Sequence, residues 1–190
     1  MNNFAEELTY WYLRFNGFFL LSNFVLHCLG HENQRGTADF DLLAIRFPYV
    51  YEKVGGQTKD WDKERFSSWG LNIDENSLAF MVEVKSGRSV RKNEIERAFT
   101  SERLEKALYR FGIFTREEVL RVAKELESQK YIEESSWVIA KLAVTEKEIR
   151  GSWLNLTLNE VDKFIRKRIE YYSKDKYLDR IYFQIFLCNT

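Results

Sequence analysis

Proline and cysteine are scarce in this chain. Its 190 residues include 1 proline, 2 cysteines and 2 histidines, and no segment is of low complexity. The two cysteines, Cys28 and Cys188, are too few for a disulfide framework, and together with His27 and His31 they do not form a zinc-binding pattern. We therefore expect both cysteines to be reduced and the protein to be cytoplasmic.

Long apolar runs are also missing. The longest candidate, Phe18–Leu29, is interrupted by Asn23 and His27 and is too short to span a membrane. It follows acidic rather than basic residues, so it does not read as a signal peptide. The formal net charge is zero, which gives no overall argument for nucleic acid. We expect no membrane partner.

The remaining composition is that of a globular protein, with 45% hydrophobic and 31% charged residues. Apolar periodicity, turn residues and a capping box from Thr115 to Glu118 divide the chain into expected elements. Helices are expected over 4–16, 92–110, 115–129 and 157–172, and strands over 18–29, 40–47, 78–85, 137–144 and 182–187, with 51–77 irregular. This order predicts one α/β domain over 1–190, with a mixed central sheet flanked by helices. Its core is expected over 4–110, completed by 137–187, with the first three strands antiparallel.

The strand expected over 78–85 ends in an acid and a base. Side chains alternate along a strand, so Glu83 and Lys85 share one face. Opposite charges at the end of an apolar strand are costly to bury unless they have a use. The alternative is a surface ion pair, which contributes only about 0–1 kcal/mol.

An aspartate lies at the head of the preceding apolar strand, where this residue type is depleted. If the strands at 40–47 and 78–85 pair, Asp41 and Glu83 converge on one cation. Two carboxylates and a backbone carbonyl suit Mg²⁺ or Mn²⁺. A metal in such a site activates water and polarises a phosphodiester, while Lys85 orients the water or stabilises the developing charge. Alternatively, Asp41 simply caps its strand.

These residues resemble the PD-(D/E)xK nuclease superfamily, whose core is a helix followed by three strands. The matching residues are Asp41-Leu-Leu-Ala and Val82-Glu83-Val84-Lys85, and 4–88 also resembles archaeal Holliday-junction resolvases through Glu6, Leu13, Gly17 and Asn23. The resemblance implies a restriction-endonuclease-like fold and a metal-dependent nuclease acting on DNA, in some relatives as a homodimer. It further implies metal ligation by Asp41, Glu83, Val84 and Glu6, with Glu7 as the alternative to Glu6.

The chain departs from the family pattern in two places. Phe40 stands where the family has a proline before its aspartate. The spacer between Asp41 and Glu83 is long and is expected to hold an insertion over 48–77.

Candidate phosphate contacts follow the Glu83 strand. Arg88, Arg91 and Lys92 lie close behind it in sequence, where a solvated turn is the alternative. The basic stripe on the helix over 157–172 (Lys163, Arg166, Lys167 and Arg168) is better explained as a solvated face. Trp61 and Trp69 are better explained by packing than by stacking on bases.

A second function class comes from residues 112–134, which faintly resemble a winged-helix unit. They favour a non-catalytic DNA-binding or scaffold protein. A winged helix requires three helices and a wing hairpin in order, and the pattern predicts only one helix and a strand here. We therefore rank this function second.

Overall fold

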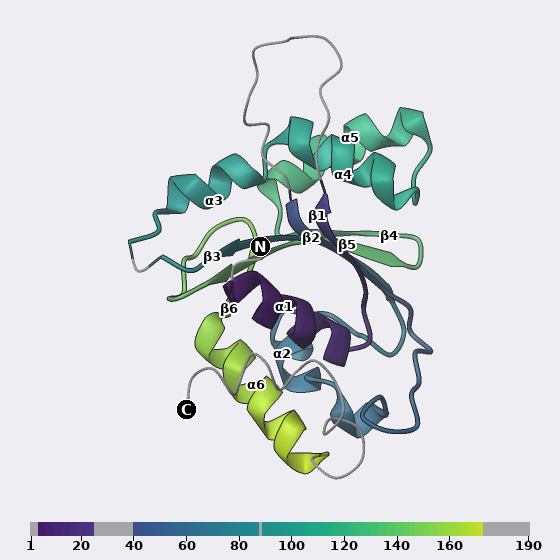
Figure 1. Cartoon of the computed structure of the whole chain (residues 1–190). Coiled ribbons are helices and arrows are strands. Elements are labelled where there is room, and N and C mark those ends of the chain that lie inside the picture. The colour runs from purple at the N-terminus through teal and green to yellow at the C-terminus, as the bar shows by residue number, and fades with distance from the viewer. Residues whose placement is uncertain (1–3, 25–39, 88, 173–190) are drawn as a thin grey trace.

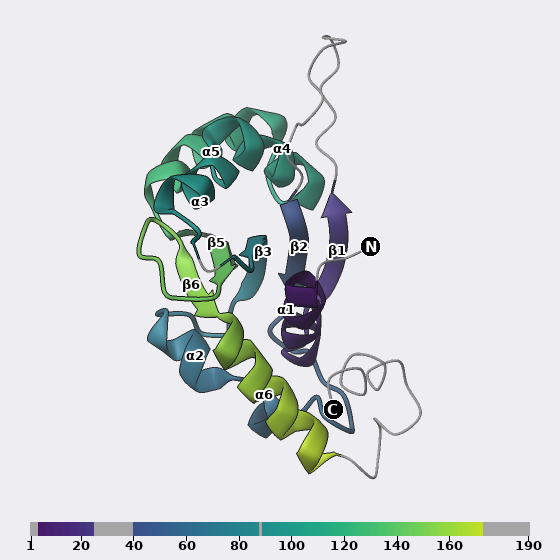
Figure 2. The same ribbon diagram turned by 60° about the vertical axis from the view of Figure 1, so that its left-hand side comes forward.

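The chain forms a mixed six-stranded sheet between two layers of helices (Figure 1). The computed structural model describes residues 4–24, 40–87 and 89–172. Helices α3, α4 and α5 cover one face of the sheet, and α1, α2 and α6 lie on the other, as the turned view also shows (Figure 2). The expected α/β class with a mixed, helix-flanked sheet is confirmed.

The strands keep most of the positions that the apolar runs predict. They are β1 (Phe19–Phe24), β2 (Phe40–Arg46), β3 (Ser77–Lys85), β4 (Tyr131–Glu134), β5 (Trp137–Thr145) and β6 (Leu154–Thr157). Their order is β1-β2-β3-β5-β4, and β6 pairs with β5. The first three strands are antiparallel, as predicted, whereas β5 is parallel to both β3 and β6.

The helices arise from apolar faces bounded by capping residues. They are α1 (Phe4–Phe15), α2 (Lys63–Ser68), α3 (Lys92–Ala98), α4 (Ser101–Phe111), α5 (Arg116–Ser128) and α6 (Leu158–Tyr171), with a 3₁₀ turn, η1, at Thr58–Asp60. Gly17 follows α1 with φ of 83°, a conformation that glycine adopts without strain. The predicted capping box between Thr115 and Glu118 is present at the start of α5. No helix in the described ranges is long and apolar enough to cross a membrane.

Several elements differ from the sequence expectation. The helix predicted over 92–110 is two helices, because the chain leaves helical geometry at Phe99 and Thr100 becomes the N-cap of α4. Helix α2 lies in a segment expected to be irregular, and β6 was not predicted. Strand β4 lies within 112–134, where a strand was expected without stated bounds. Short elements such as these offer too few residues for a periodic pattern to stand out.

The segment that resembles a winged helix is built into the main sheet. Helices α4 and α5 are followed by the β4–β5 hairpin. Strand β5, however, also pairs with β3 and with β6. The hairpin is therefore part of the central sheet and is not a free wing.

Some expectations fall on residues outside the described ranges. These are the strand predicted over 182–187, the end of the strand predicted over 18–29, both cysteines (Cys28 and Cys188), both histidines (His27 and His31) and Arg88.

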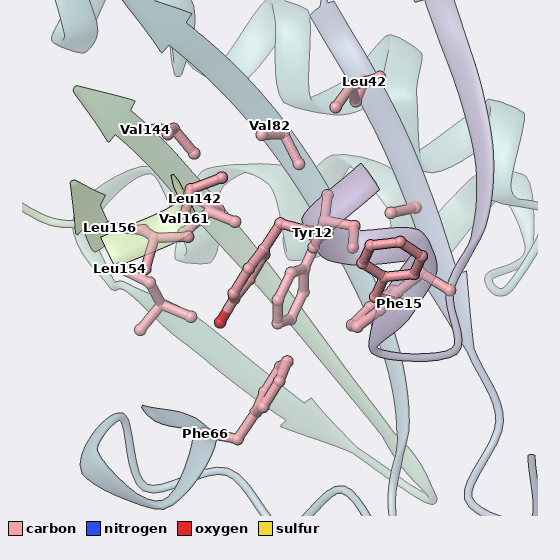
Figure 3. Close-up of a cluster of buried hydrophobic side chains, with 14 of the residues drawn as sticks. Tyr12, Phe15, Leu42, Phe66, Val82, Leu142, Val144, Leu154, Leu156 and Val161 are labelled. Carbon is pink, nitrogen blue, oxygen red and sulfur yellow. The ribbon is translucent and has the colours of Figure 1, made fainter. Parts of the chain in front are cut away.

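Each face of the sheet has its own apolar core. On one face, Leu42 and Val82 pack with Tyr12 of α1, Phe66 of α2 and Val161 of α6 (Figure 3). On the other face, a separate set packs beneath α3, α4 and α5. It includes Leu43, Ala79, Met81, Ile95, Leu104, Val122 and Ile139. Two cores explain why β3 is almost continuously apolar, since both of its faces are covered.

Two buried arginines hold the insertion over 48–77 against the α1–β1 turn. Arg46, at the end of β2, donates from Nε to the Asn16 carbonyl at 2.9 Å and from Nη1 to the Ile73 carbonyl. Arg168 of α6 donates to the carbonyls of Phe15, at 2.9 Å, and of Gly55 and Asp60. Because these carbonyls are buried, each needs a donor.

This arrangement corrects one sequence interpretation. Arg168 was grouped with the solvated basic stripe of its helix, yet it is only 5% exposed. Its neighbours Lys163, Arg166 and Lys167 are exposed, as expected. Arg168 is therefore a structural residue that satisfies backbone acceptors.

Replacing Arg168 by methionine tests this role. The variant keeps an apolar stem and removes every donor, so three buried carbonyls lose their partner. We expect the free energy of unfolding to fall by about 3–5 kcal/mol. Urea denaturation followed by circular dichroism measures this change. Lys167→Met, at the exposed neighbouring position, is the matched control and should stay within about 0.5 kcal/mol of wild type. Equal losses in the two variants would contradict the anchoring role.

Candidate active site

The pairing of β2 with β3 brings two carboxylates together. The register sets Leu42 opposite Val82 and Leu43 opposite Met81. Continued by one residue, it sets Asp41 opposite Glu83. Side chains directly opposite in an antiparallel pair share a face, with Cβ atoms about 4.5–5.5 Å apart. The prediction that these two strands are neighbours is confirmed.

Strand alternation decides which face carries this pair. Leu42, Val82 and Val84 belong to the core beneath α1 and α6. Leu43 and Met81 belong to the core beneath α3, α4 and α5. Asp41, Glu83 and Lys85 have the same parity as this second set, so they lie on the face covered by α3–α5. They lie at the end of the sheet where β2 begins and β3 ends.

The Glu83 carboxylate is buried between two cations. Glu83 is only 5% exposed. Lys85 Nζ lies 2.6 Å from Oε1, and Arg103 Nη2 lies 3.8 Å from Oε2. Among the residues that the structure describes, no donor makes a hydrogen bond to Oε2. Oε2 of the buried carboxylate thus has a nearby positive charge but no hydrogen bond, and such an arrangement costs stability.

The half-buried Asp41 carboxylate binds the backbone of the neighbouring strand. Its Oδ2 accepts a hydrogen bond from the Val84 N–H at 2.7 Å. The paired register of β2 with β3 begins at Leu42, so the side chain of Asp41 takes the place of a backbone acceptor. A carboxylate offers about four lone-pair sites, so this bond does not exhaust the acceptor capacity of Asp41.

The charges in this cluster shift one another's protonation. Burial raises the pKa of Glu83 above its ordinary value, and the nearby Asp41 charge raises it further, while Lys85 and Arg103 oppose both effects. Burial by itself lowers the pKa of Lys85, but Glu83 and Asp41 outweigh it, so the net shift is upward. Lys85 is therefore held as an ammonium at neutral pH.

Arg103 joins the site from α4 and was not predicted. Its side chain is 15% exposed, and its guanidinium carbon lies 5.1 Å from the centre of the Phe40 ring. Only the long-range packing of α4 places Arg103 beside Glu83.

Polar residues also lie at this end of the neighbouring parallel strands, β5 and β6. On β5, Thr145 is in register with Lys85, and Ala143 is in register with Glu83. On β6, Asn155 is in register with Ala143. The Asn155 amide donates to the Ala143 carbonyl at 3.3 Å and to Thr145 Oγ1 at 3.2 Å. These bonds tie β6 to β5 and place polar groups at the carboxyl ends of three parallel strands, where α/β sheets commonly bind ligands.

The other expected ligands come from α1 and from the backbone of β3. Glu6 and its alternative, Glu7, lie on α1, which packs on the opposite face. Within the described ranges, no group of three or more acidic, histidine or cysteine residues is arranged to hold a metal ion. Val84 lies between Glu83 and Lys85, and its side chain belongs to the opposite core. The metal-binding roles of Glu6 and of the Val84 carbonyl stay predictions.

Two of the expected phosphate contacts lie in the helical layer above the carboxylates. Arg91 and Lys92 are exposed at the start of α3, whose Ile95 packs in the core on the Glu83 face. The Arg91 backbone N–H donates to the Glu94 carboxylate at 3.2 Å. The ammonium of Lys92 lies 3.5 Å from a Glu96 carboxylate oxygen. The basic stripe of α6 instead lies in the opposite layer.

The two tryptophans of the insertion take part in packing. Trp61 is buried, and the Arg46 guanidinium lies over its ring, with 5.2 Å between the guanidinium carbon and the ring centre. Trp69 is half-buried and meets the Phe66 ring edge-on, with 5.6 Å between centroids.

The influence of Asp41 on Glu83 is directly measurable. In Asp41→Asn the neighbouring negative charge is gone while burial is kept, so we expect the pKa of Glu83 to fall. Carbon-detected NMR titration of the Glu83 side-chain carboxyl measures this value. Glu118, whose pKa is lowered by its hydrogen bonds to Thr115 on the exposed start of α5, is the internal control and should not change. A Glu83 pKa that is equal in both proteins would contradict the proximity of the two carboxylates.

Comparison of the chain with protein-family models, with curated proteins and with solved structures finds no match.

Proposed function

We propose that this protein is a metal-dependent nuclease that hydrolyses phosphodiester bonds, with DNA as its substrate. The observation that carries the proposal is the register that sets Asp41 opposite Glu83, with Lys85 on the same face. The order α1-β1-β2-β3, one helix and three antiparallel strands, supports it, because the PD-(D/E)xK core that the sequence resembles has this order. A restriction-endonuclease-like fold is part of the proposal.

The donor set fits a hard divalent cation. Like charges directly opposite each other in a sheet are destabilising, and the Asp41–Glu83 pair is of this kind. The buried Oε2 of Glu83 receives no hydrogen bond from the described residues, which leaves acceptor capacity at this oxygen. Carboxylate and carbonyl oxygens suit Mg²⁺ or Mn²⁺. The residues that would hold it are Asp41, Glu83 and the Val84 carbonyl, with Glu6 proposed from the family resemblance alone.

A bound divalent cation would supply Lewis-acid polarisation of the phosphodiester and a water of lowered pKa. Lys85 supplies a point charge on the same face, held protonated by Glu83 and Asp41. Such a charge orients a water molecule or stabilises negative charge that develops on the phosphate. Burial of Glu83 lowers the local dielectric, which strengthens each of these interactions.

The substrate is proposed to approach over α3, which belongs to the helical layer on the Glu83 face. Arg91 and Lys92 stand at the start of this helix and are the proposed backbone contacts. Arg88 belongs to the same proposal from its sequence position. The competing function is a non-catalytic DNA-binding or scaffold protein, in which these same cations bind phosphate and Asp41 only caps β3.

Neutralising either carboxylate tests the metal site. Asp41→Asn and Glu83→Gln are expected to abolish cleavage of plasmid and branched DNA in Mg²⁺ or Mn²⁺, because each removes a charged ligand. Folding and most DNA binding should persist, since neither residue is a phosphate anchor. Cleavage is read on gels, and binding by fluorescence anisotropy. Full activity in both variants would refute the assignment.

Lys85 separates an enzyme from a binding module. In a nuclease, Lys85→Ala should slow cleavage by about 10²–10³-fold, the range for a lost stabilising charge. Lys85→Arg should not restore the rate, because a planar fork does not replace a compact ammonium in a tight site. In a binding module, Lys85→Ala would only weaken DNA binding and lower its salt dependence by about one unit of slope.

Both quantities are measured on the same Lys85→Ala sample. Lost cleavage with near-normal binding would exclude the binding-module alternative. Unchanged cleavage with weakened, less salt-dependent binding would exclude the catalytic role of Lys85.

A further inference from the structure

A pocket lies beside β6, on the other side of β5 from the Glu83 strand. Its volume of about 540 Å³ is in the range of small-molecule sites. Helix α2, the α5–β4 turn, the β5–β6 loop, β6 and the start of α6 form its walls. The residues that line it include Arg65, Trp69, Lys130, Arg150, Trp153 and Glu160. Every lining residue and its neighbours in sequence belong to the described ranges.

The loop between β5 and β6 forms a rigid wall of this pocket. Trp153 is only 2% exposed, and its Nε1 donates to the Ile149 carbonyl at 2.9 Å. The indole ring lies against Gly151, where a larger residue would have no room for its side chain. This wall is therefore formed before any ligand binds, and a ligand does not have to order it.

A buried lysine lies behind the same wall. Lys141 of β5 is fully buried, and its Nζ donates to the Glu127 carbonyl at 2.8 Å and to Ser152 Oγ at 3.3 Å. Its backbone N–H donates to the carbonyl of the lining residue Lys130 at 3.1 Å. Because Ser152 belongs to the β5–β6 loop, Lys141 contacts both the loop and the α5–β4 turn that border the pocket.

The charge of Lys141 has little compensation within the described chain. Both of its side-chain acceptors are neutral, a carbonyl and a hydroxyl, and it makes no ion pair with a described residue. Burial lowers the pKa of Lys141 to about 8, and the charge of the exposed Glu127 opposes this shift only in part. The ammonium form still prevails at neutral pH, where a buried charge without a counter-ion costs stability.

The wall itself carries further cations. Arg65 forms an ion pair with Glu160, and Arg150 Nε lies 3.0 Å from a Glu148 carboxylate oxygen. Lys130 makes no ion pair with a described residue. The two pairs are neutral, so Lys130 and the lysine behind it leave an excess of positive charge at the pocket. Such an excess favours an anionic ligand.

We propose that this pocket binds the phosphate group of a nucleotide-sized ligand, with Lys130 and Arg65 as its contacts and Lys141 as a compensating charge behind the wall. Arg65 uses Nη2 for Glu160, and within the described ranges its other N–H groups have no hydrogen-bond partner. A guanidinium and an ammonium are the usual phosphate donors. Trp69, which is half-buried, adds an aromatic surface of the kind on which bases stack. The inference does not depend on the proposed nuclease function, because β5 separates this pocket from β3.

The first test measures ligand binding in the absence of metal. Deoxyadenosine monophosphate, deoxyadenosine and inorganic phosphate are each titrated into the protein in EDTA, and NMR follows the backbone amides of Lys130 and Gly151. The nucleotide should shift both amides and should bind at least about tenfold more tightly than the nucleoside, since charge-assisted hydrogen bonds to phosphate are the main contacts. Equal affinities for nucleotide and nucleoside would overturn the proposal.

The second test removes the exposed cation of the wall. Lys130→Gln should weaken binding of the nucleotide by about tenfold, whereas Lys130→Arg keeps the charge and should bind nearly as wild type does. Lys124→Gln, at an exposed position of α5 that does not line the pocket, is the matched control and should bind normally. Urea denaturation checks that the variants are equally stable. Normal binding by Lys130→Gln would refute the assignment.

The third test concerns the buried lysine in the wild-type protein. A bound phosphate stabilises the ammonium form, so saturating nucleotide should raise the pKa of Lys141 above its value without ligand. Heteronuclear NMR titration of the lysine side chain measures both values. Among the described residues, Glu127 is the only titratable group that acts on Lys141, and it is present in both samples. An identical pKa in the two samples would exclude Lys141 as the compensating charge.

Two sources of the phosphate are compared by the same titration. Tighter binding of a 5′-phosphorylated oligonucleotide than of the mononucleotide, lost in Lys130→Gln, would support the proposal with a DNA strand end as ligand. Equal binding, also lost in this variant, would support it with a free nucleotide. Because no metal is present, these results are separate from cleavage. A wild type that binds nucleotide but does not cleave DNA refutes the nuclease alone, and one that cleaves DNA but does not bind nucleotide refutes this inference alone.

Discussion

The register between β2 and β3 is the constraint on which the candidate site depends. Leu42 opposite Val82 places Asp41 opposite Glu83, and a slip of one residue would turn Asp41 toward the α1–α6 core. Both ends of β2 are held by hydrogen bonds between side chains and backbone groups. At one end the Asp41 carboxylate accepts the Val84 N–H, and at the other Arg46 donates to carbonyls beyond the strand. The residue proposed to bind metal therefore also helps to hold the alignment that the site requires.

Three arginines of this protein make two kinds of contact. Arg46 and Arg168 donate mainly to backbone carbonyls and hold the insertion against α1 and α6. Arg103 instead meets a carboxylate at ion-pair distance, over an aromatic ring. The first two arginines are accordingly structural, whereas Arg103 compensates the charge of Glu83.

The sequence predicts those features that local patterns determine. Apolar runs locate β2, β3 and β5, the capping box starts α5, and Glu83 with Lys85 share a face because strand side chains alternate. The sequence does not predict the features that depend on long-range packing. Nothing in the local pattern separates buried Arg168 from its exposed neighbour Lys167, and the approach of Arg103 to Glu83 depends on how α4 docks.

The charge balance of the cluster bears on how the fold and a metal are related. A buried carboxylate with no cation nearby would be strongly destabilising, and burial already raises the pKa of Glu83. Lys85 and Arg103 compensate the charge of Glu83 from within the chain. This carboxylate therefore does not depend on a metal ion for charge compensation. A structural zinc site behaves differently, because there the fold itself depends on the metal. Here the chain supplies its own cations to the Glu83 carboxylate, so the metal that we propose would not be required for folding.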